Sequence, residues 1–167
     1  KDIITNSLFN YLCVFDSIDI LKWFLNVSYK INLSNKNNLP FILSCENGRL
    51  KTAKWLYNIN PHFNISINND IIFKKVCRNG HLEVAKWLLK KKPDIDISYN
   101  EESVFSNACF YGHLEIVKWL YSIKPDINIH IKENICFVWA CINNKLDIAK
   151  WLYSIDESVC VEDDSDY

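Results

Sequence analysis

The amino-acid sequence repeats itself every 32 residues, and this period constrains the fold more than any other feature. Tryptophan, cysteine and phenylalanine each recur five times in one register, and a lysine precedes each of these tryptophans. The ladders are Trp23, Trp55, Trp87, Trp119 and Trp151; Cys13, Cys45, Cys77, Cys109 and Cys141; and Phe9, Phe41, Phe73, Phe105 and Phe137. Three ladders in one register predict a tandem array of five units, each packed on its neighbours.

Each unit has the pattern of two helices joined by a tight turn, and the fourth copy shows it best. Apolar residues at helical spacing after Ser103 predict a first helix with Ser103 as its N-cap. Gly112 ends that helix, and a second, largely apolar helix begins near His113. Pro125 ends the second helix, and the alternating stretch 126–131 predicts a short extended arm. The predicted fold class is all-α, a solenoid of helix-turn-helix units with short extended arms.

These second helices resemble those of ankyrin repeats. The segments 80–89 (GHLEVAKWLL) and 112–120 (GHLEIVKWL) match the ankyrin second-helix pattern, and 93–96 (PDID) stands where ankyrins carry Ala-Asp-Val-Asn. The recurring Lys-Trp-Leu-Tyr more narrowly resembles the ankyrin families of giant amoeba-infecting DNA viruses. The resemblance implies a scaffold that binds another protein in a concave groove, without an enzymatic activity or a cofactor.

Some features depart from the ankyrin pattern. The Thr-Pro-Leu-His opening of the first helix is missing, and the period is 32 residues instead of the usual 33. The Asp-x-x-Gly turn is replaced by 68–70 (NND) and 100–102 (NEE). We therefore expect shorter hairpin fingers between repeats than ankyrins usually have.

The period also predicts the domain organisation. The first unit is degenerate at 16–18 (DSI), which suits either a capping repeat or a divergent one. The last helix remains apolar, so we expect another element to cover it or the native chain to continue. An ankyrin array over 1–157 and an acidic tail over 158–167, mobile beyond Cys160, are predicted, with approximate repeats 7–38, 39–70, 71–102, 103–134 and 135–157.

Composition excludes two classes of partner at this stage. The formal net charge of −1 gives the chain no overall attraction for nucleic acid. No apolar run approaches the roughly 20 residues that span a bilayer, so no membrane segment is predicted.

The cysteines and histidines fit packing better than chemistry. Stacked helices lie about 8–10 Å apart, whereas a disulfide needs Cα atoms within about 7 Å, so neighbouring ladder cysteines are not expected to bridge. Seven free cysteines suit a reducing compartment such as the cytoplasm. His81 and His113 are interpreted as packing or capping residues, because a repeated position rarely hosts a unique catalytic site. No catalytic residue, metal ligand or cofactor is predicted.

Positions that vary between otherwise constant repeats are the candidates for recognition. The two residues before each inter-helix turn change from copy to copy, and the ankyrin resemblance implies that they face the groove. Two arm residues are added as weaker candidates. Phe110 and Tyr111 are the expected hot spot. The predicted partner-binding residues are Glu46, Asn47, Arg78, Asn79, Tyr99, Glu102, Phe110, Tyr111, Ile142 and Asn143.

Two further interpretations stay open, each with one alternative. The tryptophan ladder is read as packing between repeats, with an exposed aromatic stripe as the alternative. The leading hypothesis for function is a viral adaptor that acts on host proteins in the host cytoplasm. The alternative is a structural or self-associating component of a viral particle or assembly, joined through the open C-terminal end.

Overall fold

The computed structural model describes residues 2–27, 31, 33, 38–60, 67–95, 97 and 104–160, and within these ranges every regular element is a helix. The predicted all-α fold class is thus confirmed. The helices are α1 (Asp2–Leu12), α2 (Ile18–Val27), α3 (Leu39–Glu46), α4 (Leu50–Ile59), α5 (Ile67–Arg78), α6 (Leu82–Lys91), α7 (Val104–Tyr111), α8 (Leu114–Ile123), α9 (Ile131–Ile142), α10 (Leu146–Ile155) and the 3₁₀ turn η1 (Glu157–Cys160).

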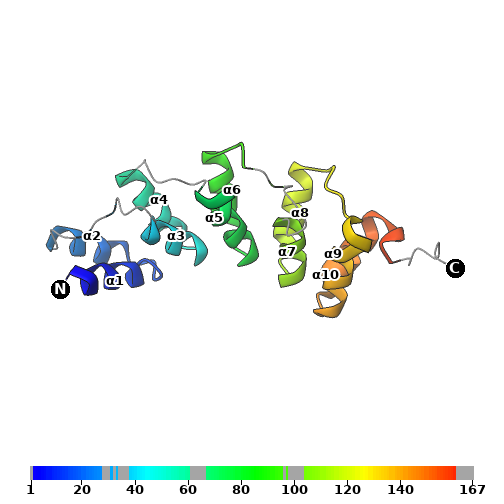
Figure 1. Ribbon diagram of the computed structural model, residues 1–167, viewed down its shortest axis with the longest axis horizontal. Coiled ribbons are helices and arrows are strands. Elements are labelled where there is room, and N and C mark those ends of the chain that lie inside the picture. The colour runs from blue at the N-terminus through cyan, green and yellow to red at the C-terminus, as the bar shows by residue number, and fades with distance from the viewer. Residues whose placement is uncertain are drawn as a thin grey trace. The chain divides into compact units, whose positions relative to one another are not determined.

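Helices pack in sequential pairs within two compact units, Lys1–Ile95 and Asp96–Tyr167 (Figure 1). In the first unit, α1 packs on α2, α3 on α4 and α5 on α6. First helices also pack on first helices (α1 on α3, α3 on α5), and α2 packs on α4. In the second unit, α7 pairs with α8 and α9 with α10, while α7 packs on α9 and α8 on α10. Each unit therefore buries its apolar ladders between successive pairs.

The phenylalanine ladder forms much of the core. Phe9, Phe41, Phe73 and Phe105 are almost fully buried, because their rings lie on the inward face of each first helix. Phe137, the last member, is only half-buried. Burying such a ring contributes about 1.5–3 kcal/mol relative to leaving it exposed, so the ladder is a principal source of stability.

Two members of the tryptophan ladder, Trp87 and Trp151, pack between helix pairs, as predicted. The Trp87 ring meets the Tyr57 ring of the preceding pair edge-on, with centroids 5.6 Å apart. Trp151 meets Tyr121 in the same way at 5.5 Å in the other unit. Edge-to-face pairs of this kind add about 0.5–1.5 kcal/mol beyond area burial. Trp23, in the first pair, is 60% exposed.

Within the described residues, four of the five inter-helix turns hold a residue in the left-handed backbone region. Gly48, Gly80 and Gly112 have φ of 71°, 84° and 90°, and Asn144 takes the equivalent place with φ 56°. At Gly48 there is a second constraint, because a Cβ would lie 2.5 Å from Nδ1 of His81. His81 is the N-cap residue of α6, but its side chain makes no N-cap hydrogen bond. The structure therefore supports a packing role for His81, against the Gly48 turn of the preceding helix pair.

The segments between repeats differ from the extended arms that were predicted. In the described residues 124–130 the chain forms two successive turns and no strand. The polar–apolar alternation arises because Ile129 is buried on the core while its neighbours Asn128 and His130 stay exposed. Ile95 anchors the turn after α6 in the same manner.

A left-handed residue also precedes the regular part of several first helices. Asn38, Asp70 and Asn134 have φ of 47°, 60° and 62°, and their spacings of 32 and 64 residues place them at the same position of the repeat. Asparagine and aspartate tolerate this conformation better than most residues do, because their short side chains bond locally to the backbone. The predicted N-cap Ser103 and the acidic tail beyond Cys160 lie outside the described residues.

Candidate protein-binding surface

The predicted recognition residues fall at one recurring place, the C-terminal end of each first helix. We call Glu46–Asn47, Arg78–Asn79, Phe110–Tyr111 and Ile142–Asn143 the helix-end positions. They close α3, α5, α7 and α9 immediately before the left-handed turns. The two arm candidates, Tyr99 and Glu102, lie outside the described residues. The helix-end positions divide between the two units, and each unit is considered separately.

In the first unit the helix-end side chains join neighbouring repeats. The Glu46 carboxylate, only 18% exposed, accepts an ion-paired hydrogen bond from Lys75 at 2.7 Å. Asn79 donates to the backbone oxygen of Glu46 at 2.8 Å. Asn47 donates through its side-chain amide to the backbone oxygen of Leu43 at 2.8 Å, which also accepts from the backbone N–H of Asn47. Glu46, Asn47 and Asn79 thus have structural partners within the chain, and Arg78 is exposed.

In the second unit the helix-end side chains form an aromatic cluster, defined as Phe110, Tyr111 and Trp139. The Phe110 ring lies 5.0 Å from the Tyr111 ring and 5.4 Å from the Trp139 ring, edge-to-face in both cases. Tyr111 is 37% exposed, and Ile142 at the end of α9 is 75% exposed. Asn143 donates to the backbone oxygen of Trp139 and so closes the end of α9. This surface therefore presents exposed apolar side chains beside a helix end whose backbone oxygen at Trp139 is hydrogen-bonded.

The ion pair and the aromatic pair occupy the same slot between repeats. Glu46 meets Lys75, and Phe110 meets Trp139, each 29 residues further along the chain. Trp139 and Lys75 were not among the predicted site residues. The signal that could have found them is the 29-residue spacing between a helix-end position and its neighbour on the next first helix. One slot therefore holds charge in one unit and aromatic surface in the other.

The family model for ankyrin repeats in three copies matches residues 57–133 and 75–163 of the chain. Together the two matches cover well over half of the sequence, and the helix pairs with left-handed turns agree with them.

The chain belongs to the ankyrin-repeat family.

Comparison with curated proteins finds no relative similar enough to count as a match. The family explains why the ladders are constant, since each repeat must present the same faces to its neighbours. Ankyrin repeats generally mediate protein–protein interaction, which agrees with variable residues at the helix ends. In the described part of this ankyrin-repeat chain, no helix is long and apolar enough to cross a bilayer.

The cysteine ladder is buried in the ankyrin core at four of its five positions. Cys13, Cys45, Cys77 and Cys109 are fully buried, as predicted, whereas Cys141 in the last pair is exposed. Burial raises the pKa of the Cys13 thiol from 9.0 to about 12, and burial raises the pKa of Cys45 and of Cys77 as well. Deprotonation, on which nucleophilic reactivity depends, is therefore suppressed throughout the buried ladder.

A second buried cysteine lies beside the ladder. Cys136 on α9 is within hydrogen-bonding reach of Cys109 on α7, and burial is the first cause that raises the pKa of the Cys109 thiol. The two helices pack on each other, so this thiol pair is part of the contact between successive ankyrin repeats. All seven cysteines are free thiols in this structure.

Burial predicts which thiols a disulfide reagent modifies. In the native protein we expect Cys141 and Cys160 to react quickly with a thiol-reactive dye, because only these two cysteines are exposed. The other five should react only after unfolding in denaturant. For Cys13, the raised pKa lowers the thiolate fraction about a thousandfold relative to a thiol with the ordinary pKa. A stopped-flow count of fast thiols tests this, with Cys141→Ser lowering the count from two to one. More than two fast thiols in the native protein would contradict the burial pattern.

His130, the N-cap residue of α9, makes two side-chain contacts. Its Nε2 lies 3.2 Å from Oδ2 of Asp156, and its Nδ1 lies 2.7 Å from Oδ1 of Asn134. Ser158 donates to the other carboxylate oxygen of Asp156 through Oγ at 2.7 Å, and this bond is the largest cause of the lowered pKa of Asp156. A catalytic triad needs histidine between serine and carboxylate, whereas here the carboxylate lies between the serine and the histidine. The arrangement ties α9 to the end of α10.

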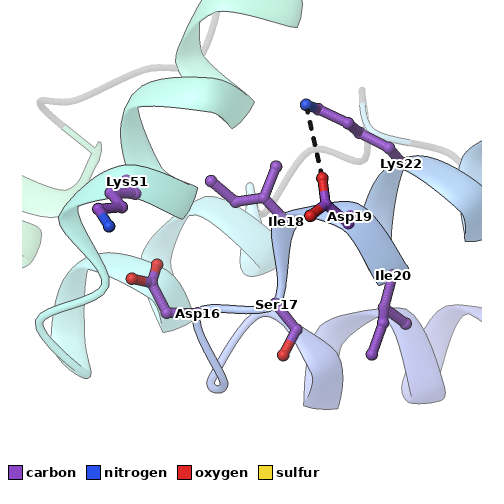
Figure 2. A pocket seen from close by; sticks show the side chains of 7 residues that line it. All are labelled: Asp16, Ser17, Ile18, Asp19, Ile20, Lys22 and Lys51. Atoms are coloured by element: carbon purple, nitrogen blue, oxygen red, sulfur yellow. Dashed lines mark ion pairs between the residues drawn. The ribbon is translucent and has the colours of Figure 1, made fainter.

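A shallow hollow near the first turn offers little for a small ligand. It is lined by Asp16, Ser17, Ile18, Asp19, Ile20, Lys22 and Lys51 (Figure 2). Asp16 accepts a hydrogen bond from Thr52 at 3.0 Å, and Asp19 pairs with Lys22 at 3.9 Å. The lining holds neither histidine nor cysteine, so this hollow has no side chain that ordinarily titrates near neutral pH. Among the described residues, no group of three histidine, cysteine or acidic side chains is placed to hold a metal ion.

Proposed function

We propose that this ankyrin-repeat chain is a non-enzymatic scaffold that binds a protein partner through the aromatic cluster and Ile142. The observation that carries the proposal is the half-exposed Phe110–Tyr111–Trp139 cluster beside a 75% exposed isoleucine. Exposed aromatic side chains on a rigid framework are typical of interface hot spots. The contacts of His130, Asp156 and Ser158 do not have the order of a catalytic triad.

The partner and compartment are proposed from the sequence and from the thiols. The Lys-Trp-Leu-Tyr recurrence resembles viral ankyrin families, which supports a viral adaptor acting on host proteins. Free thiols at every cysteine support a reducing compartment such as the host cytoplasm. The net charge of −1 favours a protein partner over nucleic acid or a membrane surface.

Two exposed side chains test this surface without disturbing the core. We expect Tyr111→Ala and Ile142→Ala each to weaken capture of the partner from host-cell lysate at least about tenfold, because each removes exposed apolar contact area. The matched control is Ile123→Ala, which changes the same residue type at the end of α8, where Ile123 is 42% exposed. Capture is measured by quantitative mass spectrometry on proteins shown to be folded by circular dichroism. Equal loss in the control, or unchanged capture in both variants, would sink the proposal.

A second candidate function rests on a different observation. Leu8 in the first helix pair and Cys141 in the last are exposed although their equivalents Ile72 and Cys109 are buried, which favours a structural or self-associating component. Leu146, 57% exposed, lies in the last pair with Cys141, at the end where self-association was predicted.

A further inference from the structure

The contacts between successive helix pairs follow one pattern, which defines an upstream and a downstream face for every pair. Cys136 reaches Cys109 of the preceding pair, and Trp87 and Trp151 meet Tyr57 and Tyr121 of theirs. Residues equivalent to Cys136 and Trp87 therefore face upstream. Residues equivalent to Cys109 and Tyr57 face downstream.

The first helix pair presents an uncovered upstream face. Leu8 is equivalent to Cys136 and to Ile72, both buried, yet Leu8 is 44% exposed. Ile20 is equivalent to Thr52, whose hydroxyl bonds Asp16 of the preceding pair, yet Ile20 is 48% exposed.

Trp23 completes this face, since it is 60% exposed whereas Trp87 and Trp151 are half-buried against a tyrosine. Figure 2 shows the Ile20 side chain on the side of α2 away from Lys51 of α4. The face therefore has the apolar composition of an internal repeat, although capping repeats are usually polar there.

The last helix pair presents the matching downstream face. Cys141 is equivalent to Cys109 but is exposed. Tyr153 is equivalent to Tyr121, which receives the Trp151 ring, yet Tyr153 is 43% exposed. The turn η1 does not replace a following pair, because its buried residue Val159 is equivalent to Ile95 and Ile127, which are ordinary anchors of the turn after the second helix.

We propose that two copies of this chain associate head to tail, with the downstream face of α9–α10 of one copy packed on the upstream face of α1–α2 of the next. Trp23 of one copy then meets Tyr153 of the other, as Trp151 meets Tyr121 inside the chain. Leu8 covers Cys141, as Cys136 covers Cys109. This interface continues a contact that the chain already makes within itself, and it uses residues other than the aromatic cluster.

Charge supports the same pairing of ends. Residues 1–38 hold four lysines and three aspartates, whereas residues 135–167 hold two lysines and seven acidic residues. The two ends thus have opposite net charge, which favours their encounter at low ionic strength and predicts weaker association at high salt. Because the contact is heterologous, a dimer keeps one free face at each end, and assembly proceeds beyond the dimer unless it closes into a ring.

Complementation between two variants tests the proposal. Sedimentation velocity over a concentration series of the full 167-residue chain should show species in steps of 19.7 kDa. Trp23→Glu and Tyr153→Glu should each weaken self-association at least about tenfold, because each leaves a carboxylate buried without a partner in the interface. An equimolar mixture should form dimers and stop there, since it contains one intact upstream face and one intact downstream face per pair of chains.

The control is Ile59→Glu, a similar change at a 44% exposed position of α4, which should assemble like the parent chain. Circular dichroism establishes that all variants are folded, as expected for substitutions at exposed sites. A parent chain that remains at 19.7 kDa throughout the series overturns the proposal. So does a mixture that fails to dimerise, or a control that loses assembly to the same degree as the two variants.

Discussion

Replacing Phe41 by alanine should lower the free energy of unfolding by about 3–5 kcal/mol, the largest effect expected of any single change considered for this chain. Phe41 is fully buried, and its ring lies 6.2 Å from the Tyr57 ring and 6.1 Å from the Trp87 ring between centroids. The change removes apolar contact with its own pair and with the next one, and it leaves a cavity between them. Domains are typically stable by only about 5–15 kcal/mol, so this loss is severe.

Urea unfolding followed by far-UV circular dichroism measures the effect on Phe41→Ala. The matched control is Phe15→Ala, because Phe15 is 45% exposed and follows α1 in the first turn. Its ring touches Tyr11 at 5.0 Å, so a loss of under about 1 kcal/mol is expected. If both variants lose the same stability, the phenylalanine ladder is not the core of the repeat.

Gly48→Ala should lower the free energy of unfolding by about 2–5 kcal/mol, because two independent constraints oppose a Cβ atom at this position. The left-handed φ of 71° costs an L-residue about 1–2 kcal/mol. The new Cβ would also lie 2.5 Å from Nδ1 of His81, and overpacking of this kind typically costs about 1–3 kcal/mol.

A double-mutant cycle separates these two contributions. In a His81→Ala background the clash is absent, so Gly48→Ala should then cost only the backbone term of about 1–2 kcal/mol. Urea unfolding of the four proteins gives the coupling energy directly. A coupling near zero would show that His81 does not crowd the turn, and the glycine would then be explained by its backbone conformation alone.

The two predictions share a cause that also explains the repeat ladders. Phe41 and Gly48 each serve two adjacent helix pairs, since Phe41 packs toward Trp87 and Gly48 makes room for His81. A change at such a position is felt in both pairs. Ladder residues are therefore the same from copy to copy. Glu46 and Phe110 stand at the same position of the repeat but differ, because each contacts one side chain 29 residues further along the chain, and the two members of such a pair can change together.

The sequence by itself determined the fold class, the helix pairs and most of the core. Its period requires equivalent residues to occupy equivalent environments, so the burial of Cys13, Cys45 and Cys109 could be read from the ladder. The turns at Gly48, Gly80 and Gly112 were predictable because only a few residue types tolerate a positive φ. The turns depend on local backbone conformation, and the burial of the ladder follows from the repeat. Both can be predicted without knowing which side chains contact one another.

Only the tertiary structure decided which residues meet across repeats. The expected extended arm over 126–131 proved to be two turns, because burial of Ile129 satisfies the alternation without a strand partner. The partners of Lys75 and Trp139 could not be read from the sequence, since a contact 29 residues away depends on how one helix pair stacks on the next. The exposure of Trp23 and Cys141 was likewise invisible in a ladder that treats all copies alike, because burial depends on a neighbouring pair and the end pairs lack one on one side within the described chain.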